Sequence, residues 1–426
     1  MNSLLRVPYT LAGVLAQGLT YIVPDGGSKL QRGLRARRGI IGRYRRWAAA
    51  NRDPSRLLAW FHAPSVGEGL QALPVIQLLQ ARLPDVQIAY THFSPSAEKF
   101  ARSTNADFID YLPFDSYGDS AAAISALQPA LLVFSKLDVW PALTETASTR
   151  RIKVGLISAT LPESSGRRGV LARNALGDAY RALDRVGAIS REDADRLADQ
   201  GVRPDRISVT GDTRYDQVWK RAGADPLALV QSLRSSAPTL VAGSTWPADE
   251  NRLLEAWVEV KKRVPTARLV IAPHEVTDEH LRSISSWVTT NSFTLSRISD
   301  SPNASSDVIL VDRYGVLGDL YAVADVAYVG GGFHAAGLHS VLEPAAFGAP
   351  VLFGPQHHKS REASALMAAG GAQVATDAGD LCGRLVRLLK SGEARDTAGA
   401  AARRVVEGGL GAAERSYTLV RELLGR

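Results

Sequence analysis

The sequence predicts an α/β protein with two Rossmann-like domains of similar size that face a central cleft. Its 426 residues exceed what a single hydrophobic core usually accommodates. In the first half, short apolar runs alternate with segments of helical periodicity, which is typical of a parallel, doubly wound sheet. The same alternation starts again after residue 238. These three observations together favour two α/β domains over one.

The individual runs give the expected elements. The strands expected in the first half are residues 57–61, 86–91, 108–111, 131–134, 154–158 and 185–189. Those of the second half are residues 239–242, 269–272, 308–310, 326–329, 351–353 and 373–375. The expected domains are a membrane-associated segment (1–52), an acceptor domain (53–217), a linker (218–238) and a donor domain (239–426), whose last helices pack back on the first domain.

The N-terminal segment combines an apolar run with a basic cluster. Residues 1–60 contain eleven Lys and Arg and two Asp, which gives this segment a net charge of +9. The whole chain has a net charge of +7, so the remaining residues sum to −2. The uncharged residues 7–23 are marginal for spanning about 30 Å, so we expect them to lie in the interface or insert weakly. The basic residues that follow predict an anionic membrane surface at the cytoplasmic face, with no nucleic-acid partner. The alternative is a core helix followed by an exposed basic helix.

Glu68 is the candidate general base. It follows the strand 57–61 in a loop rich in Ser and Gly, and a helix is expected over residues 70–81. A carboxylate there is suited to taking a proton from an acceptor hydroxyl, with Ser65 and Gly67 as neighbours on the acceptor side. The alternative is that Glu68 merely complements the helix dipole.

Three further charged residues follow predicted strands. Lys136 and Asp138 come after the apolar run 131–134, so they face the expected cleft, with Asp138 as a further acceptor-side candidate, or they form a local ion pair. Arg214 follows the strand-like residues 207–210, where it either supports a departing phosphate or is a solvated surface residue. Asp193 and Asp195 resemble a metal-binding pair, but their helical context predicts a solvated face, and no metal site is expected.

A second glycine-rich loop is the candidate donor site. The glycines at 330–332 let the backbone approach a ligand, and an amphipathic helix over residues 340–347 offers its N-terminus to a phosphate. Glu343 then accepts hydrogen bonds from ribose hydroxyls. Ser340 and Glu343 also match a capping box, which is the alternative reading.

At these residues the chain resembles the 3-deoxy-D-manno-octulosonic acid (Kdo) transferases, which have a GT-B glycosyltransferase fold. The motifs that carry the resemblance, in family order over nearly the whole chain, are HAPSVGEGLQALPVI, KLDVWP, LISATL, VTGDTRYD, VAGSTWPADE, LVIAPHE, LYAVADVAYVGGGF and GLHSVLEPAAFGAPVLFGP. Together they are specific, although each alone is weak.

The resemblance implies a role for each matching residue. It makes Glu68 the base and gives Lys136 and Arg214 transition-state support. The donor contacts that it implies are Pro273, His274, Tyr314, Gly315, Val316, Ser340, Val341, Leu342 and Glu343. The common family pattern has glutamate at Lys136, lysine at Arg214, arginine at His274, glutamate at Val316 and Asn-Pro at Ser340-Val341. Lys136, Arg214, His274 and the GGGF loop resemble a Bacteroidetes-like branch, whereas Ser340 in place of asparagine is not explained in this way. Together the departures affect the exact donor contacts more than the reaction class.

The resemblance also implies the activity. It predicts an inverting, metal-independent transferase that moves Kdo from CMP-Kdo to a lipid A precursor in lipopolysaccharide biosynthesis, at the cytoplasmic face of the inner membrane. Alternatives are a GT-B transferase for another nucleotide sugar and a non-catalytic membrane or RNA-binding protein. The sequence leaves open the number of Kdo units, the choice between Kdo and a related ulosonic acid, and the oligomeric state.

Overall fold

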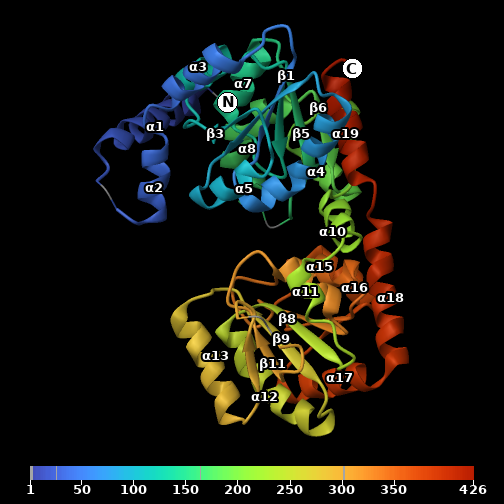
Figure 1. Ribbon diagram of the computed structural model, residues 1–426. Coiled ribbons are helices and arrows are strands. Elements are labelled where there is room, and N and C mark those ends of the chain that lie inside the picture. Colours follow the sequence, from blue (N-terminus) through green and yellow to red (C-terminus); the bar gives the residue numbers. More distant parts are fainter. Residues whose placement is uncertain (1–2, 25, 164, 301–302) are drawn as a thin grey trace. The chain divides into compact units, whose positions relative to one another are not determined.

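The computed structural model describes residues 3–24, 26–163, 165–300 and 303–426, and the chain forms two compact units (Figure 1). The first unit contains the chain up to Asp216 together with Leu410–Arg426, and the second contains Gln217–Gly409. Each unit is built on one seven-stranded sheet in which all pairs are parallel. The prediction of two doubly wound α/β sheets is therefore confirmed.

The sheet of the first unit has the strand order β3-β2-β1-β4-β5-β6-β7. Its strands are β1 (Leu58–His62), β2 (Gln87–His92), β3 (Phe108–Tyr111), β4 (Leu131–Ser135), β5 (Lys153–Ala159), β6 (Arg185–Ala188) and β7 (Ile207–Val209). Its connecting helices are α4 (Val66–Arg82), α5 (Glu98–Arg102), α6 (Tyr117–Leu127), α7 (Pro141–Thr149), α8 (Val170–Arg181) and α9 (Arg191–Asp199). The last helix, α19 (Ala412–Leu423), packs against α4 and β5 of this unit (Figure 1).

Continuous apolar runs explain the central strands. Every residue of β1 and β4 is buried, as expected for parallel strands that helices cover on both faces. The strand order reverses between these two strands, because β1 pairs with both β2 and β4. Ligands of open α/β sheets bind at this reversal, beyond the carboxyl ends of the strands. The loops after β1 and β4 are therefore the ones that the fold brings together.

The second unit repeats this plan with the order β10-β11-β9-β8-β12-β13-β14. Its strands are β8 (Thr239–Thr245), β9 (Arg268–Pro273), β10 (Leu295–Arg297), β11 (Val308–Leu310), β12 (Val326–Val329), β13 (Val351–Phe353) and β14 (Ala372–Val374). Its longer helices are α12 (Pro247–Arg263), α13 (Asp278–Thr290), α16 (Arg361–Ala369), α17 (Ala378–Lys390) and α18 (Gly392–Gly408). The reversal lies between β8 and β12, which bear the loops of the candidate donor site.

The predicted linker, residues 218–238, contains helices. The helix α10 (Arg214–Ala222) begins in the first unit and continues past its boundary, and the short α11 (Ala228–Gln231) follows. Strand β10 is absent from the sequence prediction, because its three residues are only partly buried and form no apolar run.

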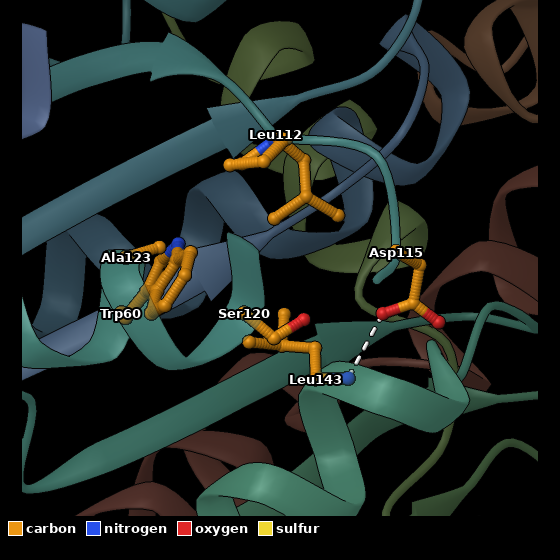
Figure 2. Close-up of a pocket in the computed structure, with 7 residues that line it drawn as sticks. Trp60, Leu112, Asp115, Ser120, Ala123 and Leu143 are labelled. Carbon is orange, nitrogen blue, oxygen red and sulfur yellow. Dashed lines mark hydrogen bonds between the residues drawn. The ribbon is translucent and has the colours of Figure 1, made fainter. Parts of the chain in front are cut away.

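Three helices precede the first sheet, namely α1 (Ser3–Ile22), α2 (Lys29–Ala36) and α3 (Ile40–Asn51). Tyr9 of α1 donates a hydrogen bond of 2.6 Å to Asp115, whose carboxylate also accepts from the backbone N–H groups of Ala142 and Leu143. Asp115 and Leu143 line one small pocket together with Trp60 (Figure 2). Helix α1 is thus attached to the first unit along one face. None of the helices in the described part of the chain has the length and hydropathy needed to cross a bilayer.

Candidate active site

Glu68 lies in the first turn of α4, immediately after β1. Helix α4 begins at Val66, four residues before the expected start, with Ser65 as its N-cap. The Ser65 hydroxyl donates to the Glu68 carboxylate and accepts from the backbone N–H of Gly67 at 3.2 Å. The sequence-predicted group of Ser65, Gly67 and Glu68 therefore forms one compact turn at the carboxyl end of β1.

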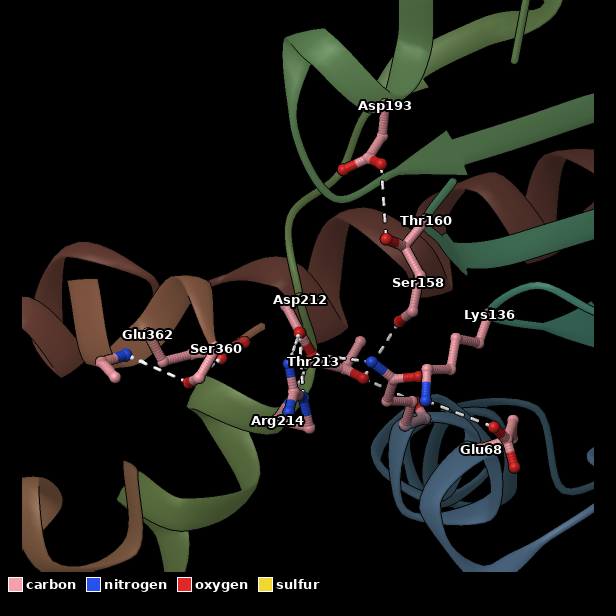
Figure 3. A network of polar contacts seen from close by, with 12 residues as sticks. Glu68, Lys136, Ser158, Thr160, Asp193, Asp212, Thr213, Arg214, Ser360 and Glu362 are labelled. Atoms are coloured by element: carbon pink, nitrogen blue, oxygen red, sulfur yellow. Dashed lines mark hydrogen bonds and ion pairs between the residues drawn. The ribbon is translucent and has the colours of Figure 1, made fainter. Parts of the chain in front are cut away.

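Lys136 reaches Glu68 from the end of β4. Its Nζ lies 3.3 Å from Oε1 of Glu68, although the two residues are 68 positions apart (Figure 3). Lys136 has a left-handed backbone with φ of 71°, which is rare for a residue other than glycine and typical of functional sites. Lys136 and Glu68 come together because β1 and β4 are neighbouring strands at the sheet reversal.

The pKa of Glu68 reflects three opposing effects. Burial alone would raise it, but the hydrogen bond from Ser65 and the charge of Lys136 outweigh burial and hold the pKa of Glu68 below its usual value. The carboxylate is therefore ionised at neutral pH, the form in which it accepts a proton. Glu68 can therefore complement the dipole of α4 and also serve as a base.

Asp138 lies near this pair but has its own cation. Arg167 donates to its carboxylate and also to the carbonyl of Leu137 at 3.1 Å. Burial raises the pKa of Asp138, and the charge of Arg167 opposes that rise. Asp138 is thus the centre of a local ion pair at the end of β4.

Arg214 belongs to a separate polar network on the same unit. Its guanidinium contacts Oδ2 of the buried Asp212 at 2.6 and 2.9 Å. Oδ1 of Asp212 accepts from Gln71 at 3.2 Å, and Gln71 lies one turn after Glu68 on α4. Arg214 is therefore a held cation rather than a freely solvated one, and the network connects it to the helix that carries Glu68.

In the second unit, aromatic rings gather around Trp246 at the end of β8. The rings of His274 and His334 stack on the indole with centroid distances of 4.4 and 4.2 Å. The indole N–H donates to Nε2 of His339 at 3.1 Å, and burial with the neighbouring His274 lowers the pKa of His339. His274, predicted from the sequence, is thus joined by three aromatic residues that the predicted site residues do not include.

The glycine-rich loop after β12 packs against its own chain. A Cβ at Gly330 would lie 2.1 Å from the carbonyl oxygen of Ser244, and one at Gly332 would lie 2.2 Å from the nitrogen of Gly354. Gly331 has φ of 92° and faces the carbonyl of Gly337 equally closely. Glycine is required at these three positions, because neighbouring backbone fills the space that a side chain would need, and the approach of a ligand to this loop stays a prediction.

The predicted helix over residues 340–347 is much shorter in the structure. Helix α15 (Leu342–Ala346) has only five residues, and its N-cap is the buried Val341, with no side-chain cap hydrogen bond. Ser340 is exposed, and the predicted capping box with Glu343 is not formed. The expected bounds of this helix and its capping box are therefore wrong, whereas donor binding at this end stays a prediction.

Glu343 instead lies among ionisable side chains. Burial raises the pKa of its carboxyl, while Arg221 opposes that rise and Asp319 adds to it. Arg221 and Asp319 approach each other to 3.8 Å. A partly buried carboxyl in this setting is suited to hydrogen bonding with ligand hydroxyls.

The remaining predicted donor residues are divided between exposed and buried positions. Tyr314 is exposed, and its hydroxyl accepts from the backbone N–H of Val276 at 2.9 Å. Gly315 has φ of 89° with open space beside it. Val316 and Pro273 are buried, so neither presents its side chain to solvent. The structure brings Tyr314 close to the His274 loop and leaves Val316 in the core.

Asp193 corrects a further expectation. It is fully buried and accepts hydrogen bonds from the backbone of Leu161 at 2.7 Å and from Ser190 at 2.8 Å, so it does not belong to a solvated helix face. Within the described residues, no three or more His, Cys, Asp or Glu side chains gather in a way that would hold a metal ion.

Comparison with known proteins connects this arrangement to one family. The family model described as 3-deoxy-D-manno-octulosonic-acid transferase (kdotransferase) matches residues 33–217. The 3-deoxy-D-manno-octulosonic acid transferase of Haemophilus influenzae is 27% identical over 92% of this chain and 93% of its own. That of Bordetella pertussis is 28% identical over 88% of this chain and 90% of its own. Over most of its length the chain is therefore similar to the Kdo transferases, and residues 33–217 match the model of that family.

Solved structures agree with the fold of this chain. The UDP-GlcNAc 2-epimerase of Neisseria meningitidis matches with a TM-score of 0.63 at 15% identity, over 87% of this chain and 99% of that one. A glycosyltransferase from Rickettsia africae matches with a TM-score of 0.57 at 12% identity, over 87% and 99%. Two parallel α/β units and these neighbours identify the GT-B fold, which alone does not fix the chemistry.

Proposed function

We propose that the protein is an inverting glycosyltransferase that moves Kdo from CMP-Kdo to a hydroxyl group of a lipid A precursor. The observation that carries the proposal is the ionised Glu68 at the sheet reversal, held by Ser65 and paired with Lys136 at 3.3 Å. Similarity to the Kdo transferases supports the substrate class, and the geometry and ionised state of Glu68 support its role as the base.

The reaction requires one proton transfer and one displacement. Glu68 takes the proton of the acceptor hydroxyl, and the resulting oxygen forms a bond to the anomeric carbon of Kdo as the bond to the CMP phosphate breaks. The departing phosphate oxygen gains negative charge, which Arg214 and Lys136 are suited to stabilise as fixed cations. Attack opposite the leaving group inverts the anomeric centre.

The second unit supplies the donor side in this proposal. The Trp246, His274 and His339 cluster offers flat rings and imidazole nitrogens for the nucleotide. Tyr314 and Gly315 lie on the neighbouring loop, and Glu343 offers a carboxyl group to the ribose hydroxyls. Ser340, Val341, Leu342, Val316 and Pro273 contribute through their backbone, since the side chains of the last four are buried.

The decisive test uses purified CMP-Kdo and a lipid A precursor, with mass spectrometry of the lipid. We expect a mass increase of one or more Kdo residues and release of CMP. Another nucleotide sugar in place of CMP-Kdo is expected to give no product. Unmodified lipid under conditions in which the protein is folded and binds CMP would contradict the proposal.

We further propose that transfer requires no metal ion. Departure of CMP develops less charge than departure of a nucleoside diphosphate, because CMP has a single phosphate, and the cations named above suffice for it. The same assay on dialysed enzyme in excess EDTA is therefore expected to proceed at the original rate. A rate that vanished in EDTA and returned with magnesium would contradict this part.

Glu343→Ala is expected to weaken CMP binding by about ten- to a hundredfold, because it removes a carboxyl group that accepts from ribose hydroxyls. Isothermal titration with CMP measures the change. Glu407→Ala, which alters an exposed carboxylate on α18 of the same unit, is the matched control and should bind normally. A fall in melting temperature with unchanged CMP affinity would assign Glu343 a structural role only.

We also propose that α1 and the basic residues after it dock on an anionic membrane, at the cytoplasmic face of the inner membrane. Residues 9, 13 and 20 of α1 face the protein, whereas its exposed large apolar side chains are Val7, Leu11, Val14, Leu15, Leu19, Tyr21 and Ile22. The exposed basic residues that follow include Lys29, Arg32, Arg38, Arg45 and Arg46. An apolar face flanked by cations is typical of interfacial helices.

Leu11→Glu/Leu15→Glu is expected to reduce binding to vesicles that contain anionic lipid by about tenfold or more. Both side chains are more than half exposed, at 56% and 68%, so the melting temperature should not change. Leu227→Glu, at an exposed leucine of the second unit, is the matched control. Raised salt should release much of the remaining binding, since the basic residues contribute about 1 kcal/mol each. Unchanged sedimentation of the double variant would exclude this face of α1.

A further inference from the structure

Asp249, in the second unit, accepts four hydrogen bonds. It lies in the first turn of α12, and its side chain is fully buried. Oδ2 accepts from the backbone N–H of Trp246 at 3.0 Å and of Gly331 at 2.7 Å. Oδ1 accepts from the backbone N–H of Phe333 at 3.0 Å and from the hydroxyl of Tyr328 at 3.1 Å.

These four bonds connect two loops that are distant in sequence. Trp246 ends the loop after β8 and carries the stacked rings of His274 and His334. Gly331 and Phe333 belong to the loop after β12, which goes on to His334 and His339. His339 in turn accepts from the indole of Trp246. A single buried side chain therefore fixes both ends of the aromatic cluster.

We propose that Asp249 is the positioning residue of the donor site, holding the glycine-rich loop and Trp246 in the arrangement that receives the nucleotide. This inference rests on the proposed donor role of the second unit. Asp249 does not bind the ligand directly, because four protein donors already occupy the accepting positions of its two carboxylate oxygens. Its effect on the nucleotide passes through the loop and the ring stack.

The chemistry of the four partners requires a carboxylate. Three of them are backbone N–H groups that can only donate, and each carboxylate oxygen accepts two bonds. An amide of the same size has one accepting atom and one donating atom. In Asp249→Asn, the less costly orientation places the NH₂ group toward the Tyr328 hydroxyl, which can turn and accept, and leaves the N–H of Phe333 without a partner. A buried N–H left without a partner is costly, so the loop should loosen there.

The test compares Asp249→Asn with Tyr328→Phe. Hydrogen exchange followed by mass spectrometry should show about tenfold faster exchange in peptides covering residues 329–335 of Asp249→Asn. Its dissociation constant for CMP and its KM for CMP-Kdo should rise about tenfold, with kcat at saturating donor and the KM for the acceptor nearly unchanged. Tyr328→Phe removes one donor and keeps the three backbone bonds, so it should change each value less than twofold.

The double variant sharpens the test. Without the Tyr328 hydroxyl, the asparagine amide has no accepting partner in either orientation, so Asp249→Asn/Tyr328→Phe should lose more than the two single changes combined. Normal CMP affinity and normal exchange at residues 329–335 in Asp249→Asn would overturn the inference. Faster exchange without a change in CMP affinity would also overturn it, since the loop would then not position the donor. If the unaltered protein binds no CMP, the proposed function fails, whereas the exchange result still reports whether Asp249 holds the loop.

Discussion

Glu68→Gln is expected to lower the rate of transfer by about 10²- to 10⁴-fold while CMP affinity stays unchanged. The amide keeps the size of the side chain and can still accept from Ser65, but it cannot take a proton from the acceptor. Nucleotide binding is assigned to the other unit, so isothermal titration with CMP should give the original affinity. Single-turnover measurement with the lipid acceptor quantifies the loss.

Glu98→Gln is the matched control for this substitution. Glu98 is also in the first turn of a helix of the first unit, and it is paired with Arg102 on the surface. Its replacement should leave transfer unchanged. A folded Glu68→Gln enzyme with near-normal turnover would remove Glu68 from the mechanism.

The pH dependence of the transfer rate tests the role of Glu68 independently. Because Ser65 and Lys136 hold the pKa of Glu68 below its usual value, the base remains ionised, and the rate should be flat, as the pH falls from 8 to about 6. Lys136→Ala removes a charge that lowers this pKa, so the acid limb of the rate profile should move to higher pH. An acid limb at the same pH in this variant would argue against coupling of the two residues.

The sequence predicted the strands well where an apolar run defines them. The fully buried β1 and β4 are recognisable because parallel strands covered on both faces need uninterrupted apolar residues. The three-residue edge strand β10 is held by pairing to β11 rather than by burial, so no local signal identifies it. The helix expected from residue 340 was overestimated, because apolar spacing there reflects a buried turn and loop.

The sequence identifies single candidate residues by local signals, but it does not predict the contacts between them. The position of Glu68 after a strand is a local signal, whereas its pairing with Lys136 depends on which strands are neighbours in the sheet. The same holds for Asp249, whose partners Gly331 and Phe333 are more than 80 positions away. A carboxylate at the third position of a helix reads locally as an N-terminal cap residue, and only the tertiary fold brings the β12 loop to it.

Arg214→Ala is expected to reduce transfer by about 10²-fold or more, because in the proposed mechanism this cation stabilises the departing phosphate. The same change should also lower stability, since it leaves the carboxylate of the buried Asp212 without its cation. The carboxylate of Asp212 keeps its hydrogen bonds from Gln71 and from the backbone N–H of residue 214, which reduces the loss of stability. The guanidinium of Arg214 is also about one-third exposed, so solvent screens part of its interaction with Asp212. We therefore expect a cost of about 1–3 kcal/mol in the free energy of unfolding.

Arg43→Ala separates the general cost of losing such a pair from any effect on transfer. Arg43 contacts both carboxylate oxygens of Asp110 at 2.7 Å, with an exposure close to that of Arg214 and Asp212. Its loss should cost comparable stability in the same unit and leave the rate of transfer unchanged.

The double variant Arg214→Ala/Asp212→Asn decides between the two roles of Arg214. Burial would raise the pKa of Asp212, but Arg214 and the hydrogen bonds hold it below its usual value, so this pair stabilises the fold above about pH 4 and loses its effect as the pH falls further. An uncharged asparagine needs no cation, so the double variant should recover much of the stability at neutral pH. Transfer should remain low, because the phosphate still lacks its positive partner. Recovery of transfer together with stability would mean that Arg214 serves only to neutralise Asp212, and the departing CMP would then depend on Lys136.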